Sequence, residues 1–204
     1  SGIHFLRRKD APRILALICT YKLGDAFATG MLRPFLKERG FALEDQAMLL
    51  GTYGSVAGMV GAVLGGALLV PLGRKRALVI FGGLQVVTMV SYLVAALGLG
   101  GRAWIYAACT IEHLVSGMAT AALFAMMMDF CRRDHAATDY TVQASAVVVA
   151  TGTAQALSGF FAQPFGYVAH FAASAVLAAA AVPAVALLYR ASDRHGPDRA
   201  VSTP

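Results

Sequence analysis

The chain has 204 residues, of which 58% are hydrophobic and only 14% are charged, and its mean hydropathy is +0.64. Soluble domains average about 45 to 50% apolar and 25% charged residues, so this composition excludes a soluble globular domain and indicates a polytopic membrane protein. The net charge of +6 does not indicate a nucleic-acid-binding protein, because the basic residues form short clusters between apolar segments rather than one soluble face.

Six apolar stretches approach the length of about 20 residues that a helix needs to cross a bilayer. Because they use most of the chain, we expect an all-α membrane protein without a soluble domain. Residues 1–13 would be a cytoplasmic linker, 14–189 the six-helix transmembrane bundle, and 190–204 a cytoplasmic tail. The six expected spans are residues 14–36, 47–70, 77–97, 103–128, 141–162 and 171–189.

The first span carries Lys22 and Asp25 near its midpoint. An ionised group at the centre of a lipid-exposed helix costs about 2.5 to 3.5 kcal/mol, so such groups usually face a partner or a water-filled cavity. At a spacing of three residues the two side chains lie on one helix face and can partly neutralise each other. After this span, Arg33-Pro34 and Gly40 indicate the end of the helix.

The second and third spans carry small and polar residues on single faces. The glycines of the second span recur at helical spacing, which lets helix backbones approach closely in lipid. We interpret them as a packing face, and the alternative is a substrate surface. In the third span, Gln85, Thr88 and Tyr92 favour hydrogen bonds between helices. The glycines of the second span are Gly51, Gly54, Gly58, Gly61, Gly65 and Gly66.

The fourth span repeats the anomaly of the first, because Glu112 and His113 lie well inside it. Glu112 shares one helix face with Ser116 and Thr120. A buried carboxyl group either pairs or binds a proton, which makes Glu112 a candidate functional residue. For His113, a packing role and a functional role are equally consistent with the sequence.

The fifth span has Thr151, Gln155 and Ser158 on one face, where packing hydrogen bonds and substrate contacts are equally consistent with the pattern. The sixth span is almost purely apolar, and only Ser174 and Pro183 interrupt it. It is typical of a lipid-facing scaffold helix.

The basic residues indicate the topology. Four of the 17 Lys and Arg residues, Arg33, Lys37, Arg39 and Arg102, fall on one expected side of the membrane, and twelve fall on the other. By the positive-inside rule both termini of this multi-pass chain are expected in the cytoplasm. The twelve are Arg7, Arg8, Lys9, Arg13, Arg74, Lys75, Arg76, Arg132, Arg133, Arg190, Arg194 and Arg199.

The cysteines indicate neither a disulfide nor a metal site. Cys19 and Cys109 lie inside apolar spans and Cys131 lies at a helix end, so we expect free thiols. We also expect no cofactor.

The spans form two sets of three. Spans one and four each carry paired ionisable residues at mid-depth, whereas spans three and six are the less polar ones. Because an odd number of crossings separates spans one and four, the two sets would have opposite orientations in the membrane. Inverted repeats with polar sites near the midplane are typical of secondary transporters.

Two motifs carry a resemblance to a known family. Residues 66–78, GALLVPLGRKRAL, resemble the cytoplasmic loop motif of the major facilitator superfamily, in which Gly-x-Leu is followed by an Asp and then by Gly-Arg-Lys. Val70 stands where the Asp would be. Residues 21–28, YKLGDAFA, resemble the start of the seventh transmembrane helix of AmpG-type permeases, relatives of the acetyl-CoA transporters. The residues that match the loop motif are Gly66, Gly73, Arg74 and Lys75.

The resemblance to AmpG-type permeases extends over about residues 12–190. Residues 76–85, RALVIFGGLQ, are similar to the ninth helix of that family, and Glu112 and Thr120 also fit its pattern. The resemblance implies that the six spans are helices seven to twelve of a twelve-helix transporter, with an N-terminal six-helix half as partner. Residues 139–145 depart from the muropeptide importers and are closer to AmpG-related siderophore permeases of the RhtX/FptX type.

In this superfamily, helices seven and ten line the central cavity, and helices nine and twelve lie outside it. We therefore expect a proton-coupled permease of a Gram-negative inner membrane that imports a bulky polar solute, such as an anhydromuropeptide or a siderophore. Asp25 or Glu112 would carry the proton, because a desolvated carboxyl group binds a proton closer to neutral pH. The expected cavity residues are Lys22, Asp25, Glu112, His113, Ser116, Thr120, Thr151 and Gln155.

Two other functions are consistent with parts of the sequence. An intramembrane enzyme could use Glu112 and His113 as acid and base, although the chain has no His-Glu-x-x-His, Gly-x-Ser-x-Gly or phosphate-binding glycine motif. A membrane scaffold without transport activity is disfavoured by the ionisable residues at mid-depth.

Overall fold

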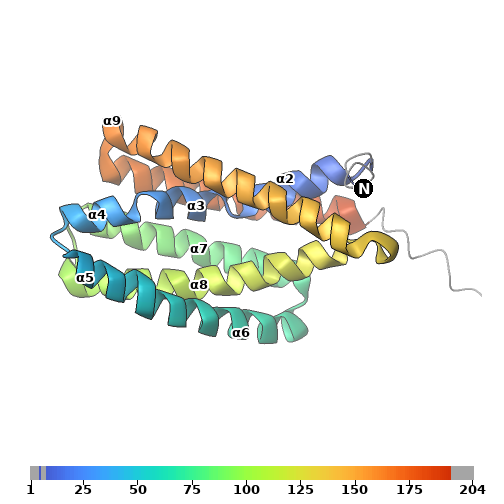
Figure 1. The fold of residues 1–204 in the computed structure, drawn as a ribbon, viewed down its shortest axis with the longest axis horizontal. Coiled ribbons are helices and arrows are strands. Elements are labelled where there is room, and N and C mark those ends of the chain that lie inside the picture. Colours follow the sequence, from blue (N-terminus) through green and yellow to red (C-terminus); the bar gives the residue numbers. More distant parts are fainter. Residues whose placement is uncertain (1–4, 6–7, 194–204) are drawn as a thin grey trace, which may run out of the picture.

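The computed structural model describes residue 5 and residues 8–193, and within them it contains helices and no strand (Figure 1). Residues 1–4, 6 and 7 of the expected linker, and most of the expected tail at 190–204, lie outside the described residues. Five helical runs of the described part are long and apolar enough to cross a membrane. The last of these runs folds back on itself, so residues 8–193 form six crossing segments.

The first crossing segment consists of three short helices, α2 (Ala11–Tyr21), α3 (Leu23–Gly30) and α4 (Leu32–Glu38). The backbone leaves helical geometry at Lys22, with φ −103° and ψ 0°, and at Met31, with φ −109° and ψ 7°. Of the two expected signals for the helix end, Arg33-Pro34 is wrong, because α4 continues to Glu38, whereas Gly40, with φ +78°, does follow the end of the helix. A proline is tolerated in the first turn of a helix, and Pro34 occupies the first turn of α4.

The second crossing segment begins with α5 (Leu43–Gln46), continues through the π-helix η1 (Ala47–Tyr53) and ends with α6 (Gly54–Leu72). The third and fourth segments are α7 (Arg74–Ala96) and α8 (Gly101–Asp129). Gly73 connects α6 to α7 with φ +72°, a backbone conformation that side chains with a Cβ rarely adopt.

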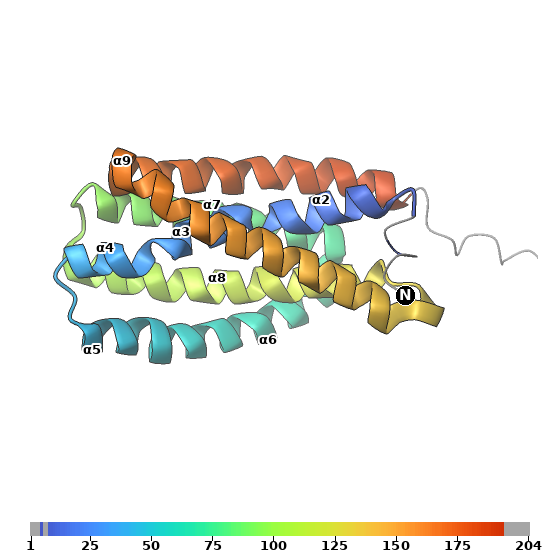
Figure 2. The ribbon, with the colours of Figure 1, turned by 45° about the horizontal axis from the view of Figure 1, so that its top comes forward.

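The short helix η2 (Arg133–His135) precedes α9 (Ala136–Asp193), which contains both remaining segments. A straight helix of this length would be about 87 Å long. Figures 1 and 2 show instead two arms that meet at a sharp reversal. The reversal lies at Gly166, where φ is +75° and ψ is +171°. We refer to residues 11–38, 43–72, 74–96, 101–129, 136–165 and 167–193 as spans one to six.

The spans run back and forth between two ends of the bundle. The start of α2, the end of α9 and the connections α6–α7 and α8–α9 lie at one end, which we call the proximal end (Figures 1 and 2). The connections α4–α5 and α7–α8 and the reversal in α9 lie at the other, which we call the distal end. This alternation agrees with the predicted grouping of the basic residues.

The contacts between spans have the symmetry of an inverted repeat. Span two packs on span four, and span one packs on span five. Span three packs on span four, and span one packs on span six. If spans one, two and three are exchanged with spans four, five and six, the contact between spans two and four becomes the contact between spans five and one. In the same way, the contact between spans three and four becomes the contact between spans six and one. The remaining large contact, between spans three and six, maps onto itself. This pattern supports the predicted 3+3 arrangement and half of a twelve-helix fold.

The glycines of span two form a packing face, as the sequence predicts. A Cβ added at Gly61 would collide with the backbone of Leu114, and a Cβ at Gly65 would collide with the backbone of Met118. Gly117 of α8 faces Gly58 in the same way. Small residues at these positions let α6 and α8 pack backbone to backbone, which is a common source of stability in lipid. Gly51 and Gly66 lie off this face, and a Cβ added at either position would have no neighbour within 4 Å.

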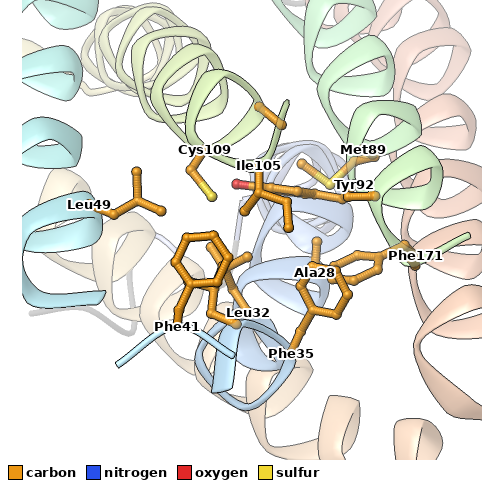
Figure 3. Close-up of a cluster of buried hydrophobic side chains, with 14 of the residues drawn as sticks. Ala28, Leu32, Phe35, Phe41, Leu49, Met89, Tyr92, Ile105, Cys109 and Phe171 are labelled. Carbon is orange, nitrogen blue, oxygen red and sulfur yellow. The ribbon is translucent and has the colours of Figure 1, made fainter. Parts of the chain in front are cut away.

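Aromatic side chains join spans one, three and six near the distal end (Figure 3). The ring centroid of Phe171 lies 5.1 Å from that of Phe35 and 5.4 Å from that of Tyr92, and all three side chains are fully buried. Span six therefore packs one face against the bundle. The same cluster fixes Tyr92, whose hydroxyl points toward α8 near Cys109 (Figure 3).

An ion-pair network ties the segment before span one to the proximal start of span five. Asp139 is fully buried and accepts two hydrogen bonds from the Arg132 guanidinium, at 2.9 and 2.7 Å. This hydrogen bonding raises the pKa of Arg132. Arg8 lies 3.8 Å from the same carboxylate and donates a hydrogen bond to the carbonyl of Phe130.

Candidate functional site

The mid-depth charges of spans one and four meet in the interior of the bundle. Lys22 Nζ lies 2.5 Å from Asp25 Oδ2 and donates a hydrogen bond of 2.9 Å to Ser116 Oγ. The Ser116 hydroxyl donates in turn to Asp25 Oδ2 at 3.1 Å. Three polar side chains from two spans therefore close a triangle, and Asp25 is only 7% exposed.

The break in span one shapes this triangle. Lys22 ends α2 and precedes α3, so Asp25 lies in the first turn of α3. The N-terminus of a helix carries a partial positive charge that favours a nearby anion. At this break the Lys22 side chain donates a hydrogen bond to Ser116, its partner on α8. Sequence pattern alone indicates no break here, because neither Gly nor Pro stands at position 22.

Glu112 forms the second half of the site and is 2% exposed. Its Oε2 accepts a hydrogen bond of 3.2 Å from the hydroxyl of Tyr92 on α7 and lies 2.9 Å from His113 Nδ1. His113 Nδ1 also lies 2.8 Å from the carbonyl oxygen of Cys109. Both neighbours of Nδ1 are acceptors, so this nitrogen carries a proton and donates it. The opposite edge of the ring faces Gly54, where a Cβ would collide with it.

The two carboxyl groups of the site also interact with each other. Asp25 and Glu112 lie near each other, because Asp25 accepts a hydrogen bond from Ser116, which is one helical turn from Glu112 on α8. Asp25 Oδ1 is buried and has no hydrogen-bond donor in the described part of the chain. Two ionised carboxylates at one site repel each other unless a proton or a cation lies between them. Lys22 can balance one of these two negative charges, so the site has room for one further proton or cation.

Two of the expected cavity residues bond within their own helices, and a third is exposed. Thr120 donates to the carbonyl of Ser116 within α8, and Thr151 donates to the carbonyl of Val147 within α9. Gln155 is exposed on span five. Within residues 8–189, no recorded hydrogen bond or ion pair joins Thr151 or Gln155 to Asp25 or Glu112. Their role in a cavity stays a prediction.

Tyr92 belongs to the site in the structure, although it is not among the cavity residues expected from the sequence. The predicted polar row of span three does contain it, and the expected hydrogen bond between helices exists for this residue. Thr88 instead donates to the carbonyl of Gln85 within α7. The side-chain nitrogen of Gln85 is buried without an acceptor among the described residues. The position of Tyr92 on a polar helix face indicates that its hydroxyl has a hydrogen-bond partner. Helical spacing alone does not identify that partner as Glu112.

The loop motif at the proximal end forms a different ion pair from the one its family pattern implies. Val70, at the position of the motif's Asp, is 85% exposed. Arg74 pairs with Asp129 at the end of α8, with Nε 2.9 Å from Oδ2. Both side chains are about 40% exposed, so the pair contributes about 0 to 1 kcal/mol. It joins spans three and four at their proximal ends.

A cavity of about 380 Å³ opens beside the site on its distal side. His113 contributes to its wall and links it to Glu112, while Thr29 and Arg33 contribute from span one. The lining residues are Thr29, Gly30, Leu32, Arg33, Pro34, Leu50 and His113.

Comparisons with known proteins agree with this architecture. Residues 3–155 match the family model of the Major Facilitator Superfamily. Over 185 residues the chain is 34% identical to the anhydromuropeptide permease of Escherichia coli (strain K12), covering 90% of this chain and 37% of that protein. Over 184 residues it is 27% identical to the putative transporter AmpG 4 of Rickettsia conorii, covering 90% of this chain and 44% of that protein. The chain thus spans less than half the length of these relatives.

Proposed function

Because this chain belongs to the Major Facilitator Superfamily and is similar to AmpG-type permeases along 90% of its length, we propose that it supplies one half of a proton-coupled secondary transporter. The transporter would import a bulky polar solute across a bacterial inner membrane. An N-terminal six-helix half would complete the cavity, since the chain spans only 37% of the Escherichia coli relative.

The observation that carries this proposal is the buried network of Lys22, Asp25, Ser116, Glu112 and His113. Ionisable groups inside a membrane are costly to keep, and they commonly mark ion or proton pathways. A carboxyl pair joined across two spans offers one place where a proton can bind. A change in its charge would alter the contact between spans one and four.

We propose an anhydromuropeptide as the solute, because the Escherichia coli relative carries that name. A siderophore is the alternative that residues 139–145 suggest. A catalytic role for Glu112 and His113 has less support, since the family comparisons point to transport.

The proposed orientation places the proximal end of the bundle in the cytoplasm, because the larger group of the basic residues that the structure describes lies there. In a background without Cys19, Cys109 and Cys131, a membrane-impermeant maleimide added to intact cells should label Arg102→Cys. The same reagent should label Lys75→Cys only after the membrane is permeabilised. The reverse labelling pattern would show that the bundle has the opposite orientation.

Uptake by reconstituted vesicles tests the proposed function. Vesicles that contain the complete transporter, including this chain, should accumulate a radiolabelled anhydromuropeptide when the outside is more acidic than the inside. A proton ionophore should reduce the accumulation to background. Vesicles that contain only residues 1–204 should accumulate none, because the site would lack the opposing half. Accumulation that ignores the ionophore would contradict proton coupling, and uptake by residues 1–204 alone would contradict the half-transporter.

A further inference from the structure

A polar row leads along span one from the buried site to the distal end of the bundle. Asp25, Thr29, Arg33 and Lys37 follow one another at intervals of four residues, which places them near one helix face. The residues of this row stay on one side of span one despite the breaks at Lys22 and Met31. Thr29 and Arg33 line the same cavity, and Arg33 and Lys37 line a second cavity.

These two cavities adjoin each other. The inner one, of about 380 Å³, is walled by His113 of the site, and the outer one has about 640 Å³. Both include Arg33 and Pro34 in their walls. Binding sites for small molecules usually have about 300 to 1,000 Å³, so either cavity has the size of a ligand site. The outer cavity is lined by Arg33, Pro34, Lys37, Phe41, Ala42, Leu43 and Gln46.

The charges of the outer cavity are all positive. Its lining contains two cations and no carboxylate. Within residues 8–189, neither Arg33 nor Lys37 forms a recorded hydrogen bond or ion pair, and both are exposed. Other cations at the distal end are engaged: Arg39 donates to the carbonyl of Ala96, and Arg102 pairs with Asp45 at 2.8 Å. Arg33 and Lys37 therefore present free donors to the cavity.

The remaining wall of the outer cavity is largely apolar. Phe41 and Leu43 flank the cations, and Leu43 is 80% exposed. An apolar wall beside two donors suits a solute that carries an anionic group next to an apolar or sugar face. Arginine binds a carboxylate through two parallel hydrogen bonds, and a lysine one helical turn away adds a second charge.

We propose that Arg33 and Lys37 form an anion subsite that receives a carboxylate of the solute at the distal mouth of the pathway. From there the solute would pass Thr29 and reach the cavity beside His113. This inference rests on the proposed transport function and on the proposed orientation, in which the distal end faces outward. The competing role for both cations is contact with lipid headgroup phosphates, which long basic side chains near helix ends commonly make.

A pair of matched probes tests the subsite. One is a labelled anhydromuropeptide with free peptide carboxylates, and the other is the same compound with those carboxylates converted to amides. Their dissociation constants would be measured on the complete transporter in phosphatidylcholine nanodiscs. Arg33→Gln with Lys37→Gln should weaken binding of the acid by about tenfold or more, since a hydrogen bond to a charged group contributes about 1.5 to 3 kcal/mol. Binding of the amide should change less than about twofold.

Two further variants separate charge from structure. Exchanging the two cations, as Arg33→Lys with Lys37→Arg, keeps both charges and should keep the preference for the acid. Arg133→Gln removes one exposed charge at the proximal end and should leave both affinities unchanged.

The possible outcomes separate the proposed anion subsite from the proposed transport function on which it rests. If the double glutamine variant binds the acid as tightly as the wild type does, the subsite is refuted while the transport proposal stands. If acid and amide weaken equally, the cations act on structure or lipid, and the subsite is again refuted. If the wild type binds neither probe, the proposed solute class fails and the subsite fails with it.

Discussion

Asp25→Asn should reduce proton-driven uptake to the level measured with a proton ionophore, without lowering the yield of folded transporter. The amide fills the same volume and can still accept the hydrogen bond from Ser116, but it cannot ionise. Lys22 would lose its anionic partner at 2.5 Å. Uptake by reconstituted vesicles, normalised to monodisperse protein from gel filtration, measures the effect. Asp134→Asn, in an exposed connection, is the matched control and should keep wild-type uptake.

A second variant separates proton coupling from helix packing. Lys22→Leu combined with Asp25→Leu removes both charges at once, and apolar substitutes for buried ion pairs are often neutral or stabilising. If the pair only holds spans one and four together, this variant would fold and transport as the wild type does. We expect it to fold and to show no proton-driven uptake. Wild-type uptake by the double variant would refute the role of Asp25 in coupling.

Gly61→Ala should destabilise the bundle more than a glycine-to-alanine change at any other glycine of span two. The added Cβ would overlap the carbonyl of Leu114, so α6 and α8 would have to separate. Overpacking of this kind costs about 1 to 3 kcal/mol, which corresponds to a loss of about 2 to 12 °C in the unfolding temperature. Thermal unfolding of the complete transporter in detergent, followed by gel filtration, measures the change.

Gly66→Ala is the matched control for this packing test. It adds the same methyl group to the same helix, but nothing lies within 4 Å of the added Cβ. Since alanine is the better helix former by about 1 kcal/mol, its unfolding temperature should stay the same or rise. Equal behaviour of the two variants would show that spans two and four lie farther apart than described.

Hydropathy predicted the six spans well, because crossing a bilayer demands long apolar helices whatever their contacts. The positions of Lys22, Asp25, Glu112 and His113 stood out for the same physical reason, since each is costly to keep in lipid. The ends of the helices were less predictable. Span one begins at Ala11 rather than Ile14, because a helix can continue beyond the apolar core into the interfacial region.

Partners across the bundle were beyond prediction from one sequence. Helical spacing places Tyr92 on a polar face, but only the packing of α7 against α8 brings its hydroxyl to Glu112. The break at Met31 does have a local signal, because Gly30 precedes it and Pro34, three residues later, cannot donate a helical hydrogen bond to the carbonyl of Gly30. Thr151 shares a face with Gln155 in the sequence pattern, yet its hydroxyl bonds within α9 because a nearby carbonyl is always available there.

The closeness of Lys22 and Asp25 in the sequence also has a consequence for the insertion of span one into the membrane. Ser116 follows Lys22 by 94 positions in the chain. At a synthesis rate of about 5 to 20 residues per second, span one waits roughly 5 to 20 s before that partner leaves the ribosome. During this interval the carboxylate three residues away is the partner that neutralises the lysine. We therefore expect the pair to help span one enter the lipid before the translocon has delivered the helix that completes the site.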